Sequence, residues 1–226
     1  MSTPGALAGF ETFDKLNIEY ENAYKNNAFK KACIDEIIRL LPAGSKVLDV
    51  GCGTGVPVSE MLAQAGMNIV GIDISPNMIQ LAKDRIEGDF TVSDMLGYEV
   101  QGEFDAILII FSHLQLLYAD FYQAAKKFAA AVKPGGILAI GQTPSDTYVD
   151  DDSHYDKDQT YVEDYDVPFM GEMLPTFMMT AEGQRKLLRS FGLDVVWEVM
   201  GTFHPDNEKC DPEEQQYTIA MRPAGP

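Results

Sequence analysis

A glycine-rich turn and two later aspartates have the spacing expected of a ligand site. The segment 51–55, Gly-Cys-Gly-Thr-Gly, directly follows a short apolar run at 46–50. Asp73 and Asp94 each come at or just after the end of a later apolar run. Open α/β sheets bind ligands at the carboxyl ends of their strands, and glycines there let the backbone approach a ligand closely. The sequence therefore predicts a ligand site at one edge of a sheet.

The spacing of this turn disfavours a phosphate ligand. A dinucleotide turn requires G-x-G-x-x-G, but Val56 occupies the sixth position, and Val56-Pro57 also stands where a phosphate loop needs lysine. Asp73 can accept hydrogen bonds from both ribose hydroxyls of an adenosine, and Asp94 can accept one from an adenine amino group. An adenosine without phosphates, bound to an acidic protein, predicts S-adenosylmethionine as the cofactor.

The elements that must position these residues follow from the apolar periodicity. Alternating helix and strand patterns indicate parallel strands joined by helices. We expect strands at 46–50, 68–73, 90–93, 104–111, 137–142, 193–200 and 216–221. We expect helices at 34–41, 58–65, from Ser75 onward, at 121–132 and at 180–191.

The connection between the last two strands determines their direction. Residues 201–215 contain two prolines and no apolar stripe, so no crossover helix separates these strands and they should run antiparallel. The predicted fold is therefore α/β, a Rossmann-like seven-stranded, mostly parallel sheet with helices on both faces and an antiparallel last strand. We expect one domain over residues 1–226.

The segment 143–179 shows no sustained period of either kind, and we interpret it as a lid or substrate insertion. Residues 146–166 hold nine carboxylates against one lysine. A solvated surface is the alternative interpretation of such a charge run. As a lid that closes over substrate, the segment would favour a neutral or cationic acceptor.

Four stretches in this order resemble the class I S-adenosylmethionine-dependent methyltransferases. They are Val47–Gly55, Gly71–Ser75, Phe104–Ile107 and Lys133–Gly136. Three further stretches resemble small fungal methyltransferases of secondary metabolism: Gly55–Val58, Asp94–Leu96 and Phe169–Gly171.

The resemblance implies a set of cofactor contacts. The methionine end would lie against the backbone of Gly51, Cys52 and Gly53, with Asp49 at its ammonium and the Phe111 backbone beside it. Asp73 would bind the ribose. The adenine would lie between Ile74 and Met95, with Asp94 at its amino group. Residues 1–30 would form a cover helix region in which Tyr20 closes over the methionine. Aromatic packing of Tyr20 on the sheet edge is the alternative.

The methyl acceptor would bind beyond the fourth strand. His113 follows that strand and is the candidate catalytic base, or otherwise a pocket wall. Tyr24, Phe169 and Met170 are further candidate substrate contacts. The remaining histidines have no second ligand at metal spacing, so no metal site is predicted.

Composition narrows the partners. The chain has 17 basic and 35 acidic residues, a formal charge of −18, which disfavours nucleic acid and anionic membrane surfaces. No apolar run reaches the roughly 18 residues of a membrane helix, and the cysteines indicate free thiols in a cytoplasmic protein. We expect a small-molecule substrate and make no prediction of the oligomeric state.

These observations predict an enzyme that moves a methyl group onto an oxygen or nitrogen atom of a small molecule, and the resemblance to fungal methyltransferases implies a secondary metabolite. The alternative is a protein of the same fold that binds the cofactor without transferring methyl. Such a protein would be a regulatory subunit, or a cyclase or isomerase that uses the bound sulfonium.

Overall fold

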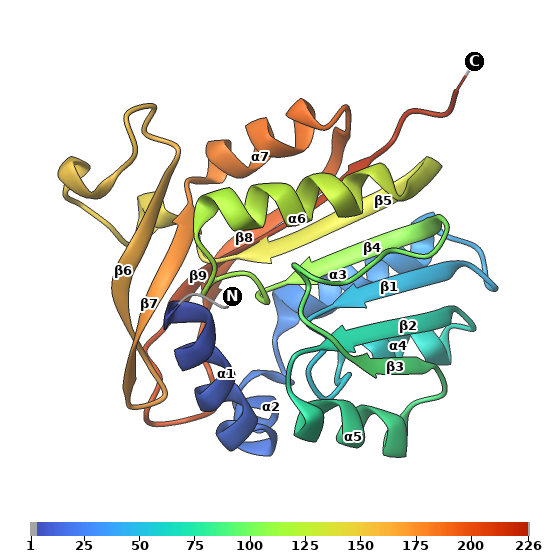
Figure 1. Cartoon of the computed structure of the whole chain (residues 1–226), viewed down its shortest axis with the longest axis horizontal. Coiled ribbons are helices and arrows are strands. Elements are labelled where there is room, and N and C mark those ends of the chain that lie inside the picture. The colour runs from blue at the N-terminus through green and yellow to red at the C-terminus, as the bar shows by residue number, and fades with distance from the viewer. Residues whose placement is uncertain (1–3, 226) are drawn as a thin grey trace.

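A seven-stranded sheet in the order β3-β2-β1-β4-β5-β9-β8 forms the centre of the computed structural model (Figure 1), which describes residues 4–225 and the side chains of residues 9–225. Its strands are β1 (Lys46–Val50), β2 (Asn68–Asp73), β3 (Asp89–Val92), β4 (Phe104–Ile110), β5 (Val132–Gln142), β8 (Asp194–Phe203) and β9 (Glu213–Met221). The first five pair in parallel, and β9 pairs antiparallel with both β5 and β8. The predicted sheet and its antiparallel last strand are confirmed.

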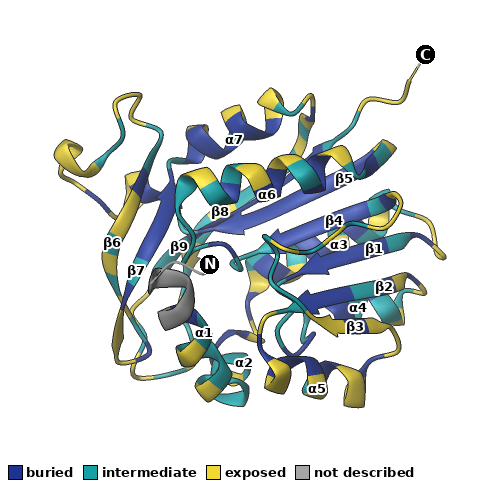
Figure 2. Cartoon of the chain, in the orientation of Figure 1, coloured by how far each residue is buried: buried dark blue, intermediate teal, exposed yellow. Residues whose placement is uncertain are grey.

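Helices cover both faces of this sheet. They are α1 (Pro4–Leu16), α2 (Ile18–Tyr24), α3 (Ala28–Leu40), α4 (Val58–Gln64), α5 (Pro76–Arg85), α6 (Tyr118–Ala130) and α7 (Ala181–Ser190). The buried side chains of α3, α4 and α5 pack on one face, and those of α6 and α7 on the other. The sheet is therefore the middle of three layers, and Figure 2 shows its central strands buried.

The central strands are apolar on both sides because both faces are covered. In β4, Ala106 and Leu108 join the core under α3 to α5, while Ile107 and Ile109 join the core under α6 and α7. Successive side chains of a strand point to opposite faces, so a strand buried on both faces reads as a continuous apolar run. This explains the uninterrupted apolar run at residues 106–110 of β4.

Ser75 begins α5 immediately after β2. Its hydroxyl accepts a hydrogen bond from the Met78 N–H at 3.1 Å, and Pro76 occupies the first helical position. A serine cap followed by proline satisfies or removes donors that have no partner at a helix start. The cap fixes where the chain leaves the sheet, and thereby the position of Asp73 at the end of β2.

The segment 143–179 contains two strands that the sequence pattern did not predict. The strands β6 (Tyr161–Phe169) and β7 (Glu172–Met179) form a separate antiparallel hairpin, preceded by 3-10 turns at Ser145–Thr147 and Asp152–His154. The sequence shows no sustained period here and predicts no strand. A register shift between Val162 and Tyr165 interrupts the alternation of β6, which left no sustained strand period.

The helices α1 and α2 lie at the carboxyl edge of the sheet, between the hairpin and α5 (Figure 1). The Asp14 carboxylate accepts hydrogen bonds from the Ser75 hydroxyl at 2.5 Å and from the Asn77 amide at 2.9 Å. Arg85 pairs with Glu21 at 2.7 Å. These contacts attach the helices of the predicted cover region to α5; residues 1–3 of that region, like Pro226, lie outside the described part of the chain.

Gly51 should be the least replaceable glycine of the turn. Its φ is +70°, and a Cβ there would lie 2.2 Å from the Ser112 Cβ. Gly135 has a similar φ of +77° but no heavy atom within 4 Å of its Cβ position. We expect Gly51→Ala and Gly135→Ala both to lose about 1 kcal/mol of unfolding free energy from the left-handed backbone, and Gly51→Ala to lose about 1–3 kcal/mol more from the clash. Urea denaturation measures both, and equal losses would contradict the prediction.

Candidate functional site

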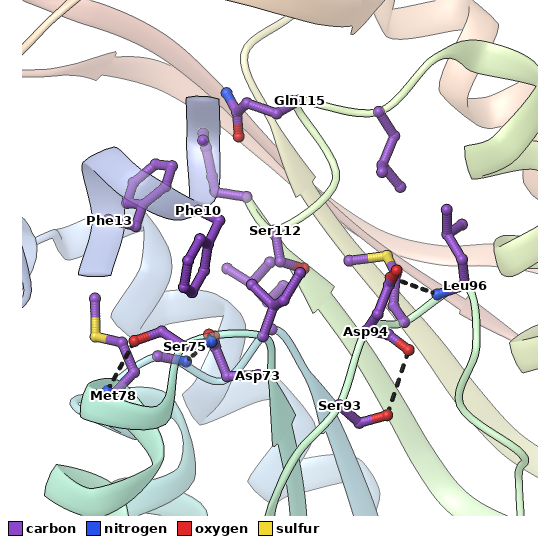
Figure 3. A pocket seen from close by; sticks show the side chains of 18 of the residues that line it. Phe10, Phe13, Asp73, Ser75, Met78, Ser93, Asp94, Leu96, Ser112 and Gln115 are labelled. Atoms are coloured by element: carbon purple, nitrogen blue, oxygen red, sulfur yellow. Dashed lines mark hydrogen bonds between the residues drawn. The ribbon is translucent and has the colours of Figure 1, made fainter. Parts of the chain in front are cut away.

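The main cavity lies at the carboxyl ends of β1, β2, β3 and β4, and its empty space, counted with the part that is open to solvent, is about 970 Å³. The cover helices contribute Phe10, Phe13 and Tyr20 to its wall. Figure 3 shows Asp73 and Ser75 on the side of α5 and Asp94 on the loop after β3. Eight of the residues predicted to contact a cofactor line it: Tyr20, Gly51, Gly53, Asp73, Ile74, Asp94, Met95 and Phe111. Their roles toward a ligand stay predictions.

Asp73 is held in place by backbone donors. Its two carboxylate oxygens accept hydrogen bonds from the Gly53 N–H and the Ser75 N–H, both at 2.8 Å. Burial raises the pKa of Asp73, and these hydrogen bonds offset only part of that effect. The carboxylate keeps further acceptor positions, because each oxygen has two lone pairs. It is therefore oriented before any ligand with hydroxyl donors arrives.

Gly53 opens onto the cavity. A Cβ at this position would find no heavy atom of the described chain nearer than the Met78 sulfur, at 3.9 Å. The backbone there can contact a ligand directly, because no side chain stands between them. Ile74 also lines the cavity and is 39% exposed, and Asp94 accepts from the Leu96 N–H at 2.9 Å. A glycine cradle, an apolar face and two carboxylates fit the adenosine and methionine parts of S-adenosylmethionine.

A smaller cavity adjoins the first and contains Asp49 and Cys52, the two remaining predicted cofactor contacts. The Asp49 carboxylate is 2% exposed and accepts a hydrogen bond from the Ser59 hydroxyl at 2.7 Å. Burial raises the pKa of Asp49 to about 6. Burial likewise raises the pKa of the Cys52 thiol, which keeps the thiol protonated and unreactive. The cavity thus offers the Asp49 carboxylate, and Cys52 does not act there as a nucleophile.

Lys30 lines this smaller cavity and was missed in the sequence. It is buried, and burial lowers the pKa of its ammonium group to about 8. The signal was present, because Lys30 lies one helical turn before Ile34 on the buried side of α3. A lysine on an otherwise apolar stripe marks a buried cation, and here it places a positive charge in the same cavity as Asp49.

A third cavity of about 870 Å³ lies between the cover helices, the hairpin and the loop before β9. The predicted substrate contacts Tyr24, Phe169 and Met170 line it. Four residues line both this cavity and the main one: Phe13, Tyr20, Phe111 and Gln115. A ligand in each cavity would meet at these shared side chains, and for that reason we call the third one the acceptor cavity.

Phe111 stands at this boundary in an unusual conformation. Its φ is +57°, which is uncommon for a residue with a side chain. Its N–H donates to the Gly141 carbonyl at 2.9 Å, and its ring lies 5.5 Å from that of Tyr217. A Cβ at Gly141 would lie 3.1 Å from the Phe111 ring, so the missing side chain makes room for it. Residues held this way occur where a site requires a particular geometry.

His113 does not line any of these cavities, which contradicts its predicted role as catalytic base and substrate contact. The side chain is fully buried, with its ring 4.2 Å from that of Phe121 and 6.0 Å from that of Phe177. Within residues 9–225 neither ring nitrogen has a hydrogen-bond partner, and burial lowers the pKa of His113 to about 3. His113 is a neutral packing residue beneath β7, a placement that depends on tertiary contacts.

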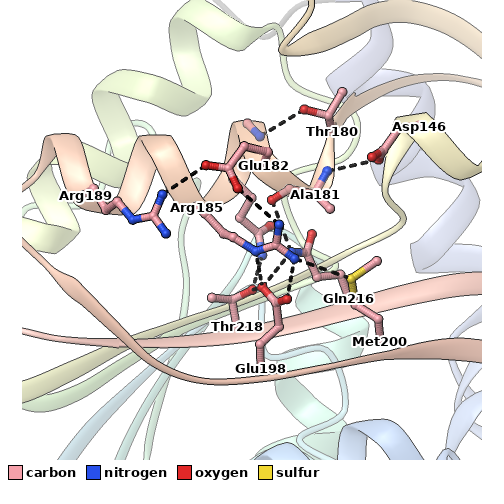
Figure 4. A network of polar contacts seen from close by, with 12 residues as sticks. Asp146, Thr180, Ala181, Glu182, Arg185, Arg189, Glu198, Met200, Gln216 and Thr218 are labelled. Carbon is pink, nitrogen blue, oxygen red and sulfur yellow. Dashed lines mark hydrogen bonds and ion pairs between the residues drawn. The ribbon is translucent and has the colours of Figure 1, made fainter.

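The hairpin wall of the acceptor cavity is anchored at its base. Gln142 exchanges two hydrogen bonds with the Met179 backbone, at 3.2 and 3.3 Å. The Ala181 N–H donates to Asp146 at 3.0 Å, and Thr180 caps α7 (Figure 4). Arg185 then ties α7 to Glu198 on β8. The end of β7 is therefore fixed to the main sheet, although the hairpin itself pairs with no strand of that sheet.

Neither a metal-binding cluster nor a membrane-spanning helix is found among the described residues. In the described part of the chain, no group of three or more His, Cys, Asp or Glu side chains could hold a metal ion. Among residues 4–225, no helix combines the length and apolarity that a membrane span requires.

The sheet order, the glycine turn after β1 and the carboxylates after β2 and β3 define a Rossmann-like α/β fold. Residues 47–136 match the family described as a methyltransferase domain.

Named relatives agree with this class. The chain is 33% identical over 106 residues to methyltransferase GfsG of Streptomyces halstedii, a match that covers 43% of this chain and 37% of that protein. It is 33% identical over 119 residues to a ubiquinone biosynthesis O-methyltransferase of Xanthomonas axonopodis pv. citri (strain 306), covering 47% and 48% of the two chains. The matches thus span less than half the length of these relatives.

Solved structures share the fold over nearly the whole chain. The Burkholderia thailandensis 1,6-didemethyltoxoflavin-N1-methyltransferase, with bound 1,6-didemethyltoxoflavin and S-adenosylhomocysteine, has a TM-score of 0.70 at 14% identity over 99% of this chain and 92% of that chain. The 4+2 cyclase SpnF has a TM-score of 0.69 at 18% identity, covering 100% of this chain and 99% of that one.

Replacing His113 should change acid stability. The folded pKa of about 3 lies below the ordinary value of 6.5, so the unfolded chain binds the extra proton and stability is lost as pH falls below 6.5. We expect the unfolding free energy of wild type to fall by about 1.4 kcal/mol per pH unit relative to His113→Leu between about pH 6 and 4.

Asp49 titrates in the opposite direction, because its raised pKa makes protonation favour the folded state. Wild type and His113→Leu both contain Asp49, so its contribution cancels in the difference between their unfolding free energies. A constant difference across this pH range would contradict the burial of a neutral His113.

Proposed function

We propose that this protein is an S-adenosylmethionine-dependent methyltransferase that acts on an oxygen or nitrogen atom of a small molecule. The observation that carries the proposal is the pair of adjoining cavities at the carboxyl edge of the sheet, which meet at Phe13, Tyr20, Phe111 and Gln115. One has the carboxylates and glycine backbone that suit the cofactor, and the other is largely aromatic and apolar. The match of residues 47–136 to a methyltransferase domain supports this assignment.

Each end of the cofactor would have its own partners. Asp73 would accept hydrogen bonds from the ribose hydroxyls, and Asp94 one from the adenine amino group. Ile74 and Met95 would cover the adenine faces. In the smaller cavity, Lys30 would attract the carboxylate of the methionine part and Asp49 its ammonium. When bound, the cofactor supplies an electrophilic methyl group on a sulfonium.

The residues of this chain would act mainly by positioning. Methyl transfer from a sulfonium is an in-line displacement, so the protein must align the two reactants and exclude water. Phe13, Tyr20 and Phe111 line both cavities and provide an apolar boundary between them. Because His113 is buried and lines neither cavity, any proton lost by the acceptor would leave by another route.

A protein of the same fold that binds the cofactor without transferring its methyl group is the alternative. The structural similarity to the cyclase SpnF supports this alternative as the second candidate, because proteins with similar folds can catalyse different reactions. Turnover separates the two: a methyltransferase produces S-adenosylhomocysteine together with an acceptor one methylene unit heavier, whereas a cyclase leaves the cofactor unchanged.

The finer assignments rest on the sequence. The relatives named above include one enzyme of ubiquinone biosynthesis, in line with a small-molecule acceptor here. The resemblance to small fungal methyltransferases of secondary metabolism depends on three short stretches. The net charge of −18 supports a protein that does not bind nucleic acid or membranes. The free cysteines support our proposal of a cytoplasmic location.

Asp73→Ala should abolish most cofactor affinity. Two hydrogen bonds from ribose hydroxyls to a carboxylate are worth about 1.5–3 kcal/mol each, so we expect the Kd for S-adenosylmethionine to rise by about 100-fold or more. Calorimetry measures the Kd, and mass spectrometry of methylated products measures turnover. Asp89→Ala, at the exposed start of β3, is the control. An unchanged Kd in Asp73→Ala would refute the ribose assignment.

Lys30→Met should weaken cofactor binding in a pH-dependent way. Below its pKa of about 8 the Lys30 ammonium can attract the cofactor carboxylate, and above it that charge is lost. We expect wild type to bind roughly tenfold tighter than Lys30→Met at pH 7, and this ratio to shrink as pH rises above about 8. Lys31→Met, at the next and exposed position, is the matched control. A ratio independent of pH would contradict the assignment.

A further inference from the structure

The acceptor cavity is rich in aromatic side chains. Tyr20 and Tyr24 lie with ring centroids 4.9 Å apart, and Phe169 stacks on Tyr24 at 6.2 Å with an interplanar angle of 26°. Phe13 contacts both Tyr20 and Phe169, at 5.4 and 5.3 Å. These four rings come from the cover helices and the hairpin and together form one wall of the cavity. Aromatic faces of this kind attract flat molecules and organic cations.

The charge in this cavity has one sign. Asp211, on the loop before β9, and Glu213, the first residue of β9, are the charged residues that line it, and no lysine, arginine or histidine of the described chain does so. Lys30, whose ammonium lies 5.9 Å from the Tyr24 ring centroid, lines the smaller cavity instead. A ligand in the acceptor cavity therefore meets carboxylates and aromatic faces.

Glu213 lacks an ionic partner in the described part of the chain. Its carboxylate accepts a hydrogen bond from the Gln215 amide. Burial raises the pKa of Glu213, and the nearby Gln215, Lys30 and Tyr24 offset this only in part. A partly buried carboxylate whose burial cost is offset only in part is stabilised when a further cation approaches it. The cavity therefore has a position where an ammonium group would relieve an unfavourable charge.

From this arrangement we infer that the methyl acceptor is a small arylalkylamine, with its amine on an aliphatic carbon, bound as an ammonium with its ring among Phe13, Tyr20, Tyr24 and Phe169 and its charge toward Glu213. The inference rests on the proposed function and names the substrate class of that site. It makes nitrogen the methylated atom. The attraction to Glu213 also counters the repulsion between the ammonium and the sulfonium in the adjoining cavity.

The transfer balances as follows. The bound ammonium first loses one proton to water, which frees the nitrogen lone pair. That pair forms the new nitrogen–carbon bond while the carbon–sulfur bond breaks and its electrons stay on sulfur. The products are a methylated ammonium and neutral sulfide, so one proton is released for each methyl moved. Glu213 is a binding residue in this scheme, because it recognises the charge and takes no proton.

The test uses three probes of similar shape that differ in charge: 2-phenylethylamine, 2-phenylethanol and 3-phenylpropanoate. Their affinities are measured by calorimetry on the full chain saturated with S-adenosylhomocysteine. We expect the amine to bind at least about tenfold tighter than the alcohol, and the carboxylate to bind most weakly. Equal binding of amine and alcohol, preference for the carboxylate, or no binding of any probe would overturn the inference.

Glu213→Gln should remove the preference for the amine while changing the affinity for the alcohol less than about twofold. Glu214→Gln is the matched control, because Glu214 does not line the cavity and its carboxylate accepts instead from the Thr202 hydroxyl. A preference that survives in Glu213→Gln would also overturn the inference.

Two further measurements keep the results interpretable. Thermal unfolding of each variant shows whether it is folded. If Glu213→Gln does not fold, the affinities of the wild-type protein for the three probes still test the substrate class. Binding of S-adenosylhomocysteine itself is measured first. Its failure would contradict the proposed function, whereas its success without discrimination among the probes would contradict only the substrate class.

Discussion

The close approach of Gly51 to Ser112 determines the geometry of the whole carboxyl edge. The Ser112 hydroxyl donates to the Val50 carbonyl at 2.6 Å, so the chain leaving β4 is bonded to the end of β1. There is no room for a side chain on Gly51 at this crossing. Because β1 and β4 are neighbours at the centre of the sheet, fixing their ends together places the glycine turn on one side and Phe111 on the other. All three cavities depend on this crossing, since each contains residues from one or both of these ends.

Much of this arrangement was predictable because it depends on local spacing. The glycine turn, Asp73 and Asp94 follow consecutive strands, and parallel strands necessarily bring their carboxyl ends to one edge. Two of the stretches that resembled a known family have a different role. Asp105 pairs with Lys133 at 2.8 Å and accepts from the Lys46 N–H, which joins β1, β4 and β5 at the opposite end of the sheet. A recognisable motif can therefore mark a structural contact as well as a ligand contact.

The features that escaped prediction depend on distant contacts. His113 is buried because β7 covers it, and that strand was hidden by the mixed polarity of the hairpin. Glu213 reaches the acceptor cavity from the start of β9, and no pattern around it distinguishes it from the other carboxylates. Lys30 differs from both, because its place on a buried stripe was visible in the helical period. Tertiary placement of single polar residues is thus the part that local patterns do not determine.

The hairpin β6–β7 forms its own two-stranded sheet and shares no strand pairing with the seven-stranded sheet. Its side chains line the acceptor cavity, and none of them lines the main or the smaller cavity. Substitutions on its inner face can therefore alter which molecules fit without disturbing the strand register or the glycine turn. In evolutionary terms the two halves of the site are free to diverge at different rates. A lineage could exchange one acceptor for another through changes in a few hairpin positions, while the central strands keep their sequence.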